Sequence, residues 1–99
     1  MNPETKFKVK VQKHLKNKYP GAWLWKTADM WTSGIPDQLM LYEGYNFWFE
    51  LKVLPNKATK IQLAIIDRIN KAGGFAGVCY TIKDVEDIIK EALGENFSN

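Results

Sequence analysis

Residues 35–52, IPDQLMLYEGYNFWFELK, contain two carboxylates and a lysine at positions that burial alone does not explain. Asp37 lies at the start of one apolar run. Glu50 and Lys52 lie within the next run, with one residue between them. Mg²⁺ binds proteins through one or two carboxylates and otherwise keeps its waters. A lysine beside such an ion can orient or help to deprotonate an attacking water and offset charge on a phosphate. These three residues predict a divalent-metal site that cuts nucleic acid.

The segment 45–53 is predicted to be a strand whose two faces differ. With the period of two that a strand imposes, one face is apolar or aromatic throughout. Glu50 and Lys52 share the other face. The two charges therefore point the same way from a strand whose opposite face is buried in a core.

A two-residue turn is predicted where Glu43 is followed by Gly44, between two strand-like runs. Such a turn lets Asp37 and Glu50 lie across adjacent strands. The carbonyl of Leu51, on the same strand as Glu50, can add a hard oxygen ligand to the metal site.

The remaining sequence predicts an α/β fold in which one mixed β-sheet is flanked by helices. Apolar residues recur at helical spacing before and after the strand-like runs, and Pro and Gly separate the segments. We expect helices at residues 2–18, 59–72 and 81–93, and strands at 22–27, 37–42, 45–53 and 75–80. Their order is α-β-β-β-α-β-α. The inward stripe of the second helix is expected to contain Ile61, Ile65 and Ile69.

The length of 99 residues predicts a single domain, 1–99, with one core. No apolar run approaches the roughly 20 residues that span a bilayer. The N-terminal segment has no apolar core of the kind found in signal peptides, and the lone Cys79 cannot form an internal disulfide. We therefore expect a cytoplasmic protein that is not secreted and does not bind a membrane.

The net charge of +3 is unevenly distributed, because lysines crowd the first predicted helix. A basic helix can attract a polyanion, and Lys6, Lys10 and Lys13 are candidate nucleic-acid contacts. The same lysines can also simply solvate an exposed helix face. Composition alone leaves both explanations open.

The order Ile35-Pro36-Asp37 followed by Glu50-Leu51-Lys52 resembles the PD-(D/E)XK nuclease superfamily. With the preceding Ser33 and Gly34, the pattern SGIPD is similar to the virus-type replication-repair nuclease family, VRR-NUC. The resemblance covers most of the chain and implies a restriction-endonuclease-like core. It also implies that Asp37 and Glu50 bind Mg²⁺ or Mn²⁺ and that Lys52 is the catalytic lysine.

The same resemblance implies further site residues, each with a competing explanation. Glu4 would correspond to a metal-binding glutamate of the first helix, but an acid in a first turn is also favoured by the helix dipole. Gln62 would be a catalytic glutamine of the second helix, but it also completes a capping box with Thr59. Apart from the resemblance, Trp31, Ser33 and Gly34 in the loop before Asp37 are candidate DNA contacts by their position. Trp31 can instead pack against the protein, and Ser33 and Gly34 can simply shape the loop.

Together these features predict a metal-dependent DNA endonuclease that works by direct attack of water, without a covalent intermediate. The preferred substrate is expected to be branched DNA, such as a Holliday junction or a flap, because a catalytic core alone offers little to select a long sequence. A homodimer would suit symmetric cutting. The resemblance suggests a phage or bacterial origin and a role in DNA repair, recombination or replication. No P-loop is present, so no nucleotide cofactor is expected.

Two other functions fit the same sequence. The chain can be a non-catalytic nucleic-acid-binding module that uses its basic helix and needs no metal. It can also be an α/β domain that binds a protein partner. In either case Glu50 and Lys52 would be an ordinary pair on a solvated strand, and Asp37 a turn residue after Pro36.

Overall fold

The computed structural model describes residues 1–27 and 33–94, and in these residues the predicted order of elements is confirmed. The helices are α1 (Pro3–Lys18), α2 (Lys60–Lys71) and α3 (Ile82–Leu93). The strands are β1 (Trp23–Lys26), β2 (Gln38–Tyr42), β3 (Tyr45–Leu51) and β4 (Phe75–Cys79). Trp31 lies outside the described residues. Within them, no helix is long and apolar enough to cross a membrane.

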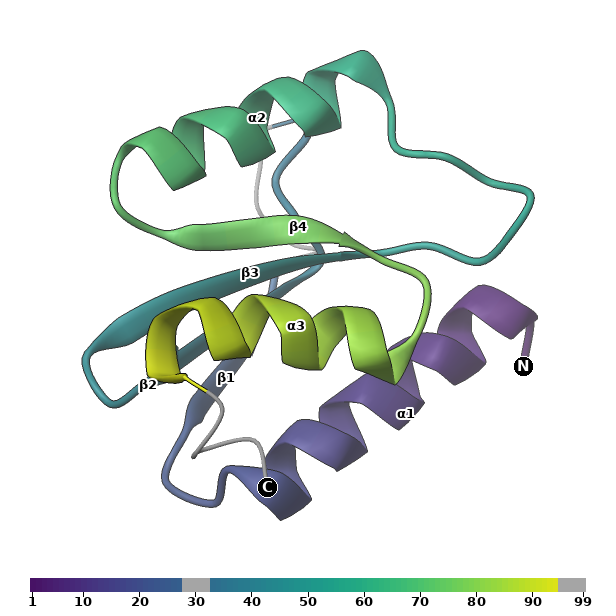
Figure 1. Cartoon of the computed structure of the whole chain (residues 1–99). Helices are drawn as coiled ribbons and strands as arrows, with labels where there is room; N and C mark the ends of the chain where they lie inside the picture. Colours follow the sequence, from purple (N-terminus) through teal and green to yellow (C-terminus); the bar gives the residue numbers. More distant parts are fainter. Residues whose placement is uncertain (28–32, 95–99) are drawn as a thin grey trace.

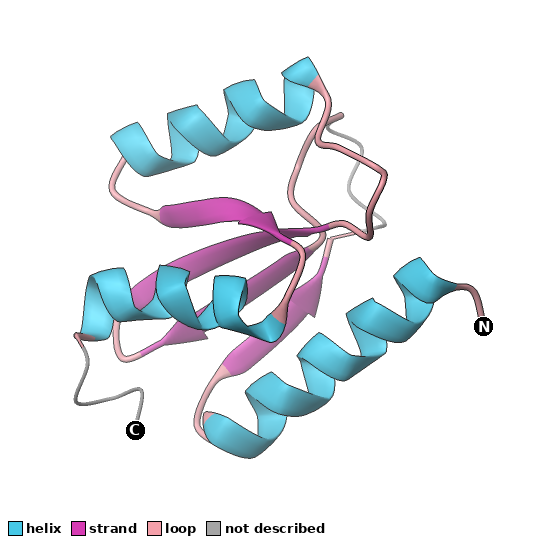
Figure 2. Cartoon of the chain, turned by 45° about the vertical axis from the view of Figure 1, so that its right-hand side comes forward, coloured by secondary structure: helices cyan, strands magenta, loops and turns pink. Residues whose placement is uncertain are grey.

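The strands form one mixed sheet in the order β1-β2-β3-β4. The first two pairings are antiparallel, and β4 pairs with β3 in parallel after the crossover through α2. Helix α2 lies on one side of the sheet, and α1 and α3 lie on the other (Figures 1 and 2). The predicted class, a mixed sheet flanked by helices, is therefore confirmed.

The main core lies between the sheet and the layer formed by α1 and α3. From β3 it receives the apolar face predicted by the period of two, since Phe47, Phe49 and Leu51 are buried. The helices contribute Val11, Leu15, Val85 and Ile89. Because the odd-numbered face of β3 is taken up by this core, the even-numbered face is turned toward the α2 side.

The expected inward stripe of α2 was wrong at Ile61, while Ile65 and Ile69 are half-buried as expected. Ile66 is the buried residue of this helix, whereas Ile61 is 56% exposed. Helix α2 contacts mainly β4 at the sheet edge. Spacing alone identifies a stripe, but the neighbour that the helix packs against decides where the centre of that stripe lies.

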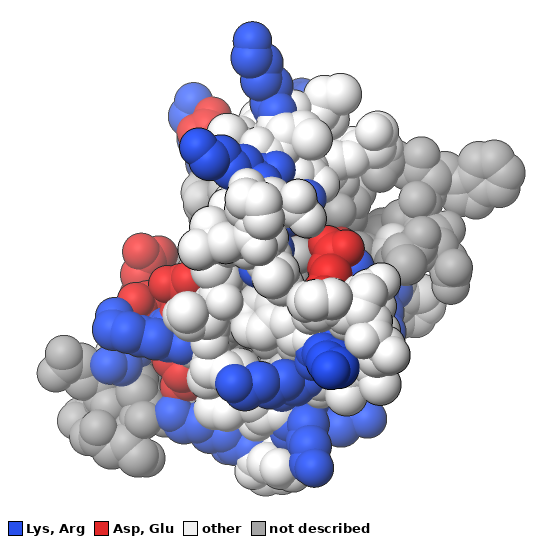
Figure 3. Space-filling model, turned by 90° about the vertical axis from the view of Figure 1, so that its right-hand side faces the viewer, with Lys and Arg blue, Asp and Glu red and all other residues white. Residues whose placement is uncertain are grey.

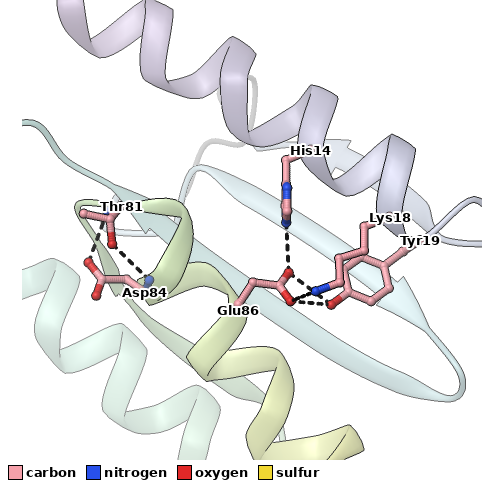
Figure 4. Close-up of polar contacts among 6 residues, drawn as sticks. All are labelled: His14, Lys18, Tyr19, Thr81, Asp84 and Glu86. Carbon is pink, nitrogen blue, oxygen red and sulfur yellow. Dashed lines mark hydrogen bonds and ion pairs between the residues drawn. The ribbon is translucent and has the colours of Figure 1, made fainter. Parts of the chain in front are cut away.

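A polar cluster around Glu86 joins α1 to α3 (Figure 4). The hydroxyl of Tyr19 donates to both carboxylate oxygens of Glu86, at 2.9 and 3.0 Å. Nε2 of His14 lies 3.0 Å from Oε2, and Lys18 forms an ion pair with Oε1. The partners come from the last turns of α1 and its C-cap, so this cluster holds that end of α1 against α3. Nearby, a capping box between Thr81 and Asp84 begins α3.

The cluster stabilises the charged form of Glu86. Burial alone would raise the pKa of Glu86, but hydrogen bonds from its three partners outweigh burial, and the pKa is lowered. Burial also raises the pKa of Tyr19, and its hydrogen bond to Glu86 adds to that rise. A carboxyl whose pKa falls on folding stabilises the protein above its unfolded pKa of about 4.3, and this contribution is lost as the pH falls through the folded-state pKa.

We expect Glu86→Gln to lower the free energy of unfolding at pH 7 by about 1–3 kcal/mol, because charge-assisted hydrogen bonds are lost in a partly buried site. The difference from wild type should shrink below about pH 4. Urea denaturation at pH 7, 5 and 3 measures both effects.

Asp87→Asn is the matched control. Asp87 forms an exposed pair with Lys83 at 2.8 Å, and its loss should cost less than about 0.5 kcal/mol. Equal losses in the two variants, or a loss for Glu86→Gln that does not change with pH, would contradict the proposed role of the cluster.

Candidate active site

Asp37 lies directly before β2, where backbone and side-chain contacts hold it. Its carbonyl accepts a hydrogen bond from the N–H of Thr27 at 3.0 Å. Its Oδ2 accepts from the N–H of Leu51 on β3, also at 3.0 Å. The side chain of Asp37 is therefore anchored to the end of β3 rather than turned freely into solvent.

Glu50 lies opposite Asp37 across the hairpin. The register pairs Gln38 with Phe49, so one further step along both antiparallel strands brings Asp37 opposite Glu50. Glu50 is only 2% exposed. The alternative in which Glu50 belongs to a solvated strand face is therefore wrong.

The environment of Glu50 is costly for a carboxylate. Burial raises the pKa of Glu50 to about 7; the Asp37 carboxylate adds to the rise, and Lys52 opposes it. The Oε1 atom is buried and has no hydrogen-bond partner among the described residues. A buried polar atom without a partner normally costs free energy, so this oxygen is available for a ligand.

Lys52 follows the end of β3, which stops one residue earlier, at Leu51. Its N–H donates to the carbonyl of Cys79 at 3.0 Å and so extends the pairing with β4. Its Nζ lies 3.5 Å from Oε2 of Glu50. The structure thus brings together the three residues that the sequence singled out.

The donor set fits a hard divalent cation. Asp37 and Glu50 supply carboxylates from adjacent strands, and Glu50 has an oxygen without a partner. In a strand, the N–H and C=O of one residue point toward the same neighbour. Since the N–H of Leu51 reaches Asp37, the Leu51 carbonyl points toward that side as well. Oxygen donors of this kind are those that Mg²⁺ and Mn²⁺ prefer.

The loop before Asp37 depends on Gly34. Its φ of 86° lies in the left-handed region that favours glycine. A Cβ there would come within 2.5 Å of Cγ2 of Ile61 and 3.2 Å of its backbone. Gly34 therefore allows the loop to approach the start of α2, while Ser33 is exposed. DNA contact by either residue stays a prediction.

Two further residues implied by the resemblance, Glu4 and Gln62, are not gathered with the trio of Asp37, Glu50 and Lys52. Glu4 lines a shallow depression with Val53 and Leu54, which follow Lys52 in the sequence. In residues 1–27 and 33–94, no three or more of His, Cys, Asp and Glu gather as a metal cluster. Oε1 of Gln62 accepts from the N–H of Thr59 at 2.8 Å, in the capping box. The site roles of Glu4 and Gln62 stay predictions.

The predicted nucleic-acid lysines lie on a solvated face of α1. Lys6, Lys10 and Lys13 are all exposed. The lysine that approaches the site is Lys8, whose Nζ lies 3.6 Å from Oδ1 of Asp37. Figure 3 views the molecule from the right-hand side of Figure 1, and basic side chains there lie above and below a small acidic group.

Two lysines near the site, Lys8 and Lys26, were missed in the sequence. Lys8 is three residues before Val11 and seven before Leu15, which places it on the inward stripe of α1. That spacing was the available signal. For Lys26 no comparable signal exists, because its place beside Asp37 depends on the pairing of β1 with β2.

Comparison with solved structures gives an informative likeness. A solved structure described as a VRR_NUC domain is similar to this chain, with a TM-score of 0.66 and 27% sequence identity. The match covers 85% of this chain and 95% of that one. No family model matches the chain, and no curated protein matches it. The likeness extends across nearly all of the fold described above.

The raised pKa of Glu50 predicts a pH-dependent effect of Glu50→Gln. Between pH 4.5 and about 7, folding must keep Glu50 protonated while the unfolded chain releases the proton, so wild-type stability falls as pH rises. We expect Glu50→Gln to be more stable than wild type by about 1–3 kcal/mol at pH 8, and by little near pH 4.5. Chemical denaturation in EDTA measures the difference.

Glu91→Gln, on the exposed surface of α3, is the control and should change stability by less than about 0.5 kcal/mol. A stability difference for Glu50→Gln that is the same at both pH values would argue against a carboxyl held in a costly environment.

Proposed function

Because the chain is a member of the VRR-NUC family and has its nuclease-type fold, we propose that it is a metal-dependent endonuclease that hydrolyses phosphodiester bonds in DNA. The observation that carries the proposal is the buried Glu50, which has an unpartnered oxygen, opposite Asp37 and beside Lys52. A structural role explains none of these features well, since a buried carboxylate is destabilising unless something binds it.

In the proposed site, Asp37, Glu50 and the Leu51 carbonyl hold Mg²⁺ or Mn²⁺. The cation, when bound, supplies charge neutralisation at the phosphate and lowers the pKa of a water nucleophile. The hydrogen bond from the Leu51 N–H fixes the orientation of the Asp37 carboxylate. That bond leaves Oδ1 of Asp37 turned toward the space beside α1, where Lys8 lies.

Lys52 is the proposed catalytic lysine. Its ammonium is held 3.5 Å from Oε2 of Glu50, and its side chain is only 15% exposed. A compact ammonium in that position can orient the attacking water and offset negative charge that develops on the phosphate. No residue of the trio is required to form a covalent bond with DNA.

Several further contacts are part of the proposal. Glu4 would complete the metal site, and Gln62 would assist catalysis from the start of α2. DNA would be bound by Lys6, Lys10 and Lys13 on the exposed face of α1, and by Ser33 and Gly34 in the loop before β2. Trp31 in the same loop would contact a displaced base.

We propose branched DNA, such as a flap or a Holliday junction, as the preferred substrate. The charged groups around the trio in the described residues are lysines, which bind phosphates as point charges. Phosphate contacts position a protein on DNA and carry no sequence information directly. Selection by DNA shape is therefore favoured over selection by sequence.

We also propose a homodimer that uses an exposed apolar patch on the sheet. Trp23, Trp25 and Leu41 lie on one face of the adjacent strands β1 and β2 and are 44–49% exposed. The rings of Trp23 and Trp25 lie 5.2 Å apart. Exposed apolar patches of neighbouring residues mark interaction surfaces, and twofold dimers are the commonest oligomers.

Cleavage of end-labelled linear, flap and four-way-junction DNA tests the proposed activity. We expect wild type to cut in Mg²⁺ or Mn²⁺ and not in EDTA. Asp37→Asn, Glu50→Gln and Lys52→Ala should each lower the rate by at least about 100-fold, because each removes a ligand or a transition-state contact. Glu91→Gln and Lys16→Ala, on exposed helix faces, should cut like wild type.

A folded wild type that binds these DNAs but cuts none of them with any metal would favour the non-catalytic binding module. Absence of both binding and cutting would remove nucleic acid as the substrate. Equal cutting of linear and branched DNA would leave the endonuclease proposal intact and reject the substrate preference.

Light scattering tests the dimer. We expect a mass of about twice the 11.4 kDa of one chain. Trp25→Lys should halve this mass, because a charge in the patch is costly to bury. Leu63→Lys places the same charge on an exposed apolar position of α2 and should leave the mass unchanged. A monomeric wild type would reject the dimer.

A further inference from the structure

A small cavity lies beside Asp37, on the α1 side of the sheet. It has a volume of about 120 Å³ and is lined by side chains from α1, β1 and the end of the hairpin. The residues that matter for its chemistry are Thr5, Lys8, Lys26, Asp37 and Leu51. At about 30 Å³ for each water, it has room for roughly four water molecules. This is the scale of a small ion rather than of a base or a nucleotide.

The cavity is electropositive, and its cations come from separate elements. Lys8 projects from α1 and Lys26 from the end of β1. The carboxylate in the lining is that of Asp37, which already accepts from the Leu51 N–H through its other oxygen. No ion pair of Lys26 is found in residues 1–27 and 33–94. Two lysines thus face one carboxylate, and that carboxylate also belongs to the candidate metal site.

Binding of a divalent cation would change this balance. Asp37 and Glu50 would then be neutralised by the cation, and Lys8 would lose its partner at 3.6 Å. Two ammonium groups and the Thr5 side chain would remain on the lining. The excess of one positive charge on the lining already favours an anion without the cation, and a bound cation would strengthen that preference. The anion nearest to a nuclease site is a phosphate of the strand.

We propose that this cavity binds a phosphate group next to the scissile one, with Lys8 and Lys26 as its cationic contacts. The proposal rests on the proposed nuclease function and deepens it by assigning a second phosphate site. Its role is to position the strand, since a phosphate held beside Asp37 fixes where the next bond lies relative to Glu50 and Lys52. The phosphate can be an internal phosphodiester or the terminal phosphate of a strand.

Titration of the wild type with inorganic phosphate, followed by amide NMR in EDTA, tests the cavity without any cutting. Chloride at equal ionic strength is the reference. We expect shift changes centred on Thr5, Lys8 and Lys26, and their loss in Lys8→Ala/Lys26→Ala. Shift changes spread over all exposed lysines, or none at the highest phosphate concentration, would overturn the proposal.

Binding of single-stranded DNA in EDTA gives a second readout. The double alanine variant should bind roughly tenfold more weakly, and the salt slope should fall by about 0.7–1, because the contact with one phosphate is lost. Lys8→Arg/Lys26→Arg keeps both charges and should retain most of the affinity. Lys16→Ala removes a charge from the exposed surface of the same helix and should change affinity less than about twofold. Equal effects of Lys16→Ala and of either cavity lysine alone would overturn the proposal.

Cleavage of chemically altered strands distinguishes the two sources of phosphate. A preference for a 5′-phosphate over a 5′-hydroxyl end indicates a terminal phosphate, and slower cutting beside an uncharged methylphosphonate indicates an internal one. In either case the double alanine variant should no longer distinguish the paired substrates. A variant that still discriminates as wild type does would overturn the proposal. A wild type that shows the phosphate shifts but cuts nothing would reject the nuclease function alone.

Discussion

The register of the β2–β3 hairpin is the constraint on which the candidate site depends. Glu43 and Gly44 both have positive φ, 52° and 82°, as a two-residue turn of type I′ requires. The turn pairs Tyr42 with Tyr45, and the same register leads to Asp37 opposite Glu50. A slip of one residue would turn Glu50 into the core and an aromatic ring toward the site. The chemistry is therefore specified by a turn at the far end of the hairpin.

The core beneath β3 offsets the free-energy cost of burying the Glu50 carboxylate. Glu50 lies between Phe49 and Leu51, which are both buried on the opposite face. Burial of large apolar side chains contributes about 1.5–3 kcal/mol each, whereas a buried carboxylate with an unsatisfied oxygen costs free energy of similar size. Stability and site thus compete within one strand. Such local conflict is typical of functional residues, which are kept for binding rather than for folding.

Local patterns predicted much of the fold and the trio, while tertiary packing decided the rest. The face shared by Glu50 and Lys52 follows from the period of a strand, and the order of elements from helical spacing and turns. The contact of Lys8 with Asp37 needs the docking of α1, which no local pattern specifies. Ile61 was expected to face inward but is exposed. The expectation failed because the sequence does not show which neighbour α2 packs against.

The residues of the site come from two parts of the fold, the β2–β3 hairpin and α1, and the polar cluster around Glu86 helps to dock only the second. Asp37 and Glu50 belong to one hairpin, whose residues are close in sequence and can pair early in folding. Lys8 reaches them only when α1 is docked, and His14 and Lys18 bind Glu86 about 9–15 Å further along the helix at 1.5 Å per residue. Loosening the docking of α1, which also depends on Val11 and Leu15 in the core, would leave Asp37 and Glu50 on their hairpin and move Lys8 away from them. Contact of Lys8 with the strand and binding of a cation by Asp37 and Glu50 thus depend on different parts of the fold. The first depends on how α1 is docked, and the second on the register of the hairpin.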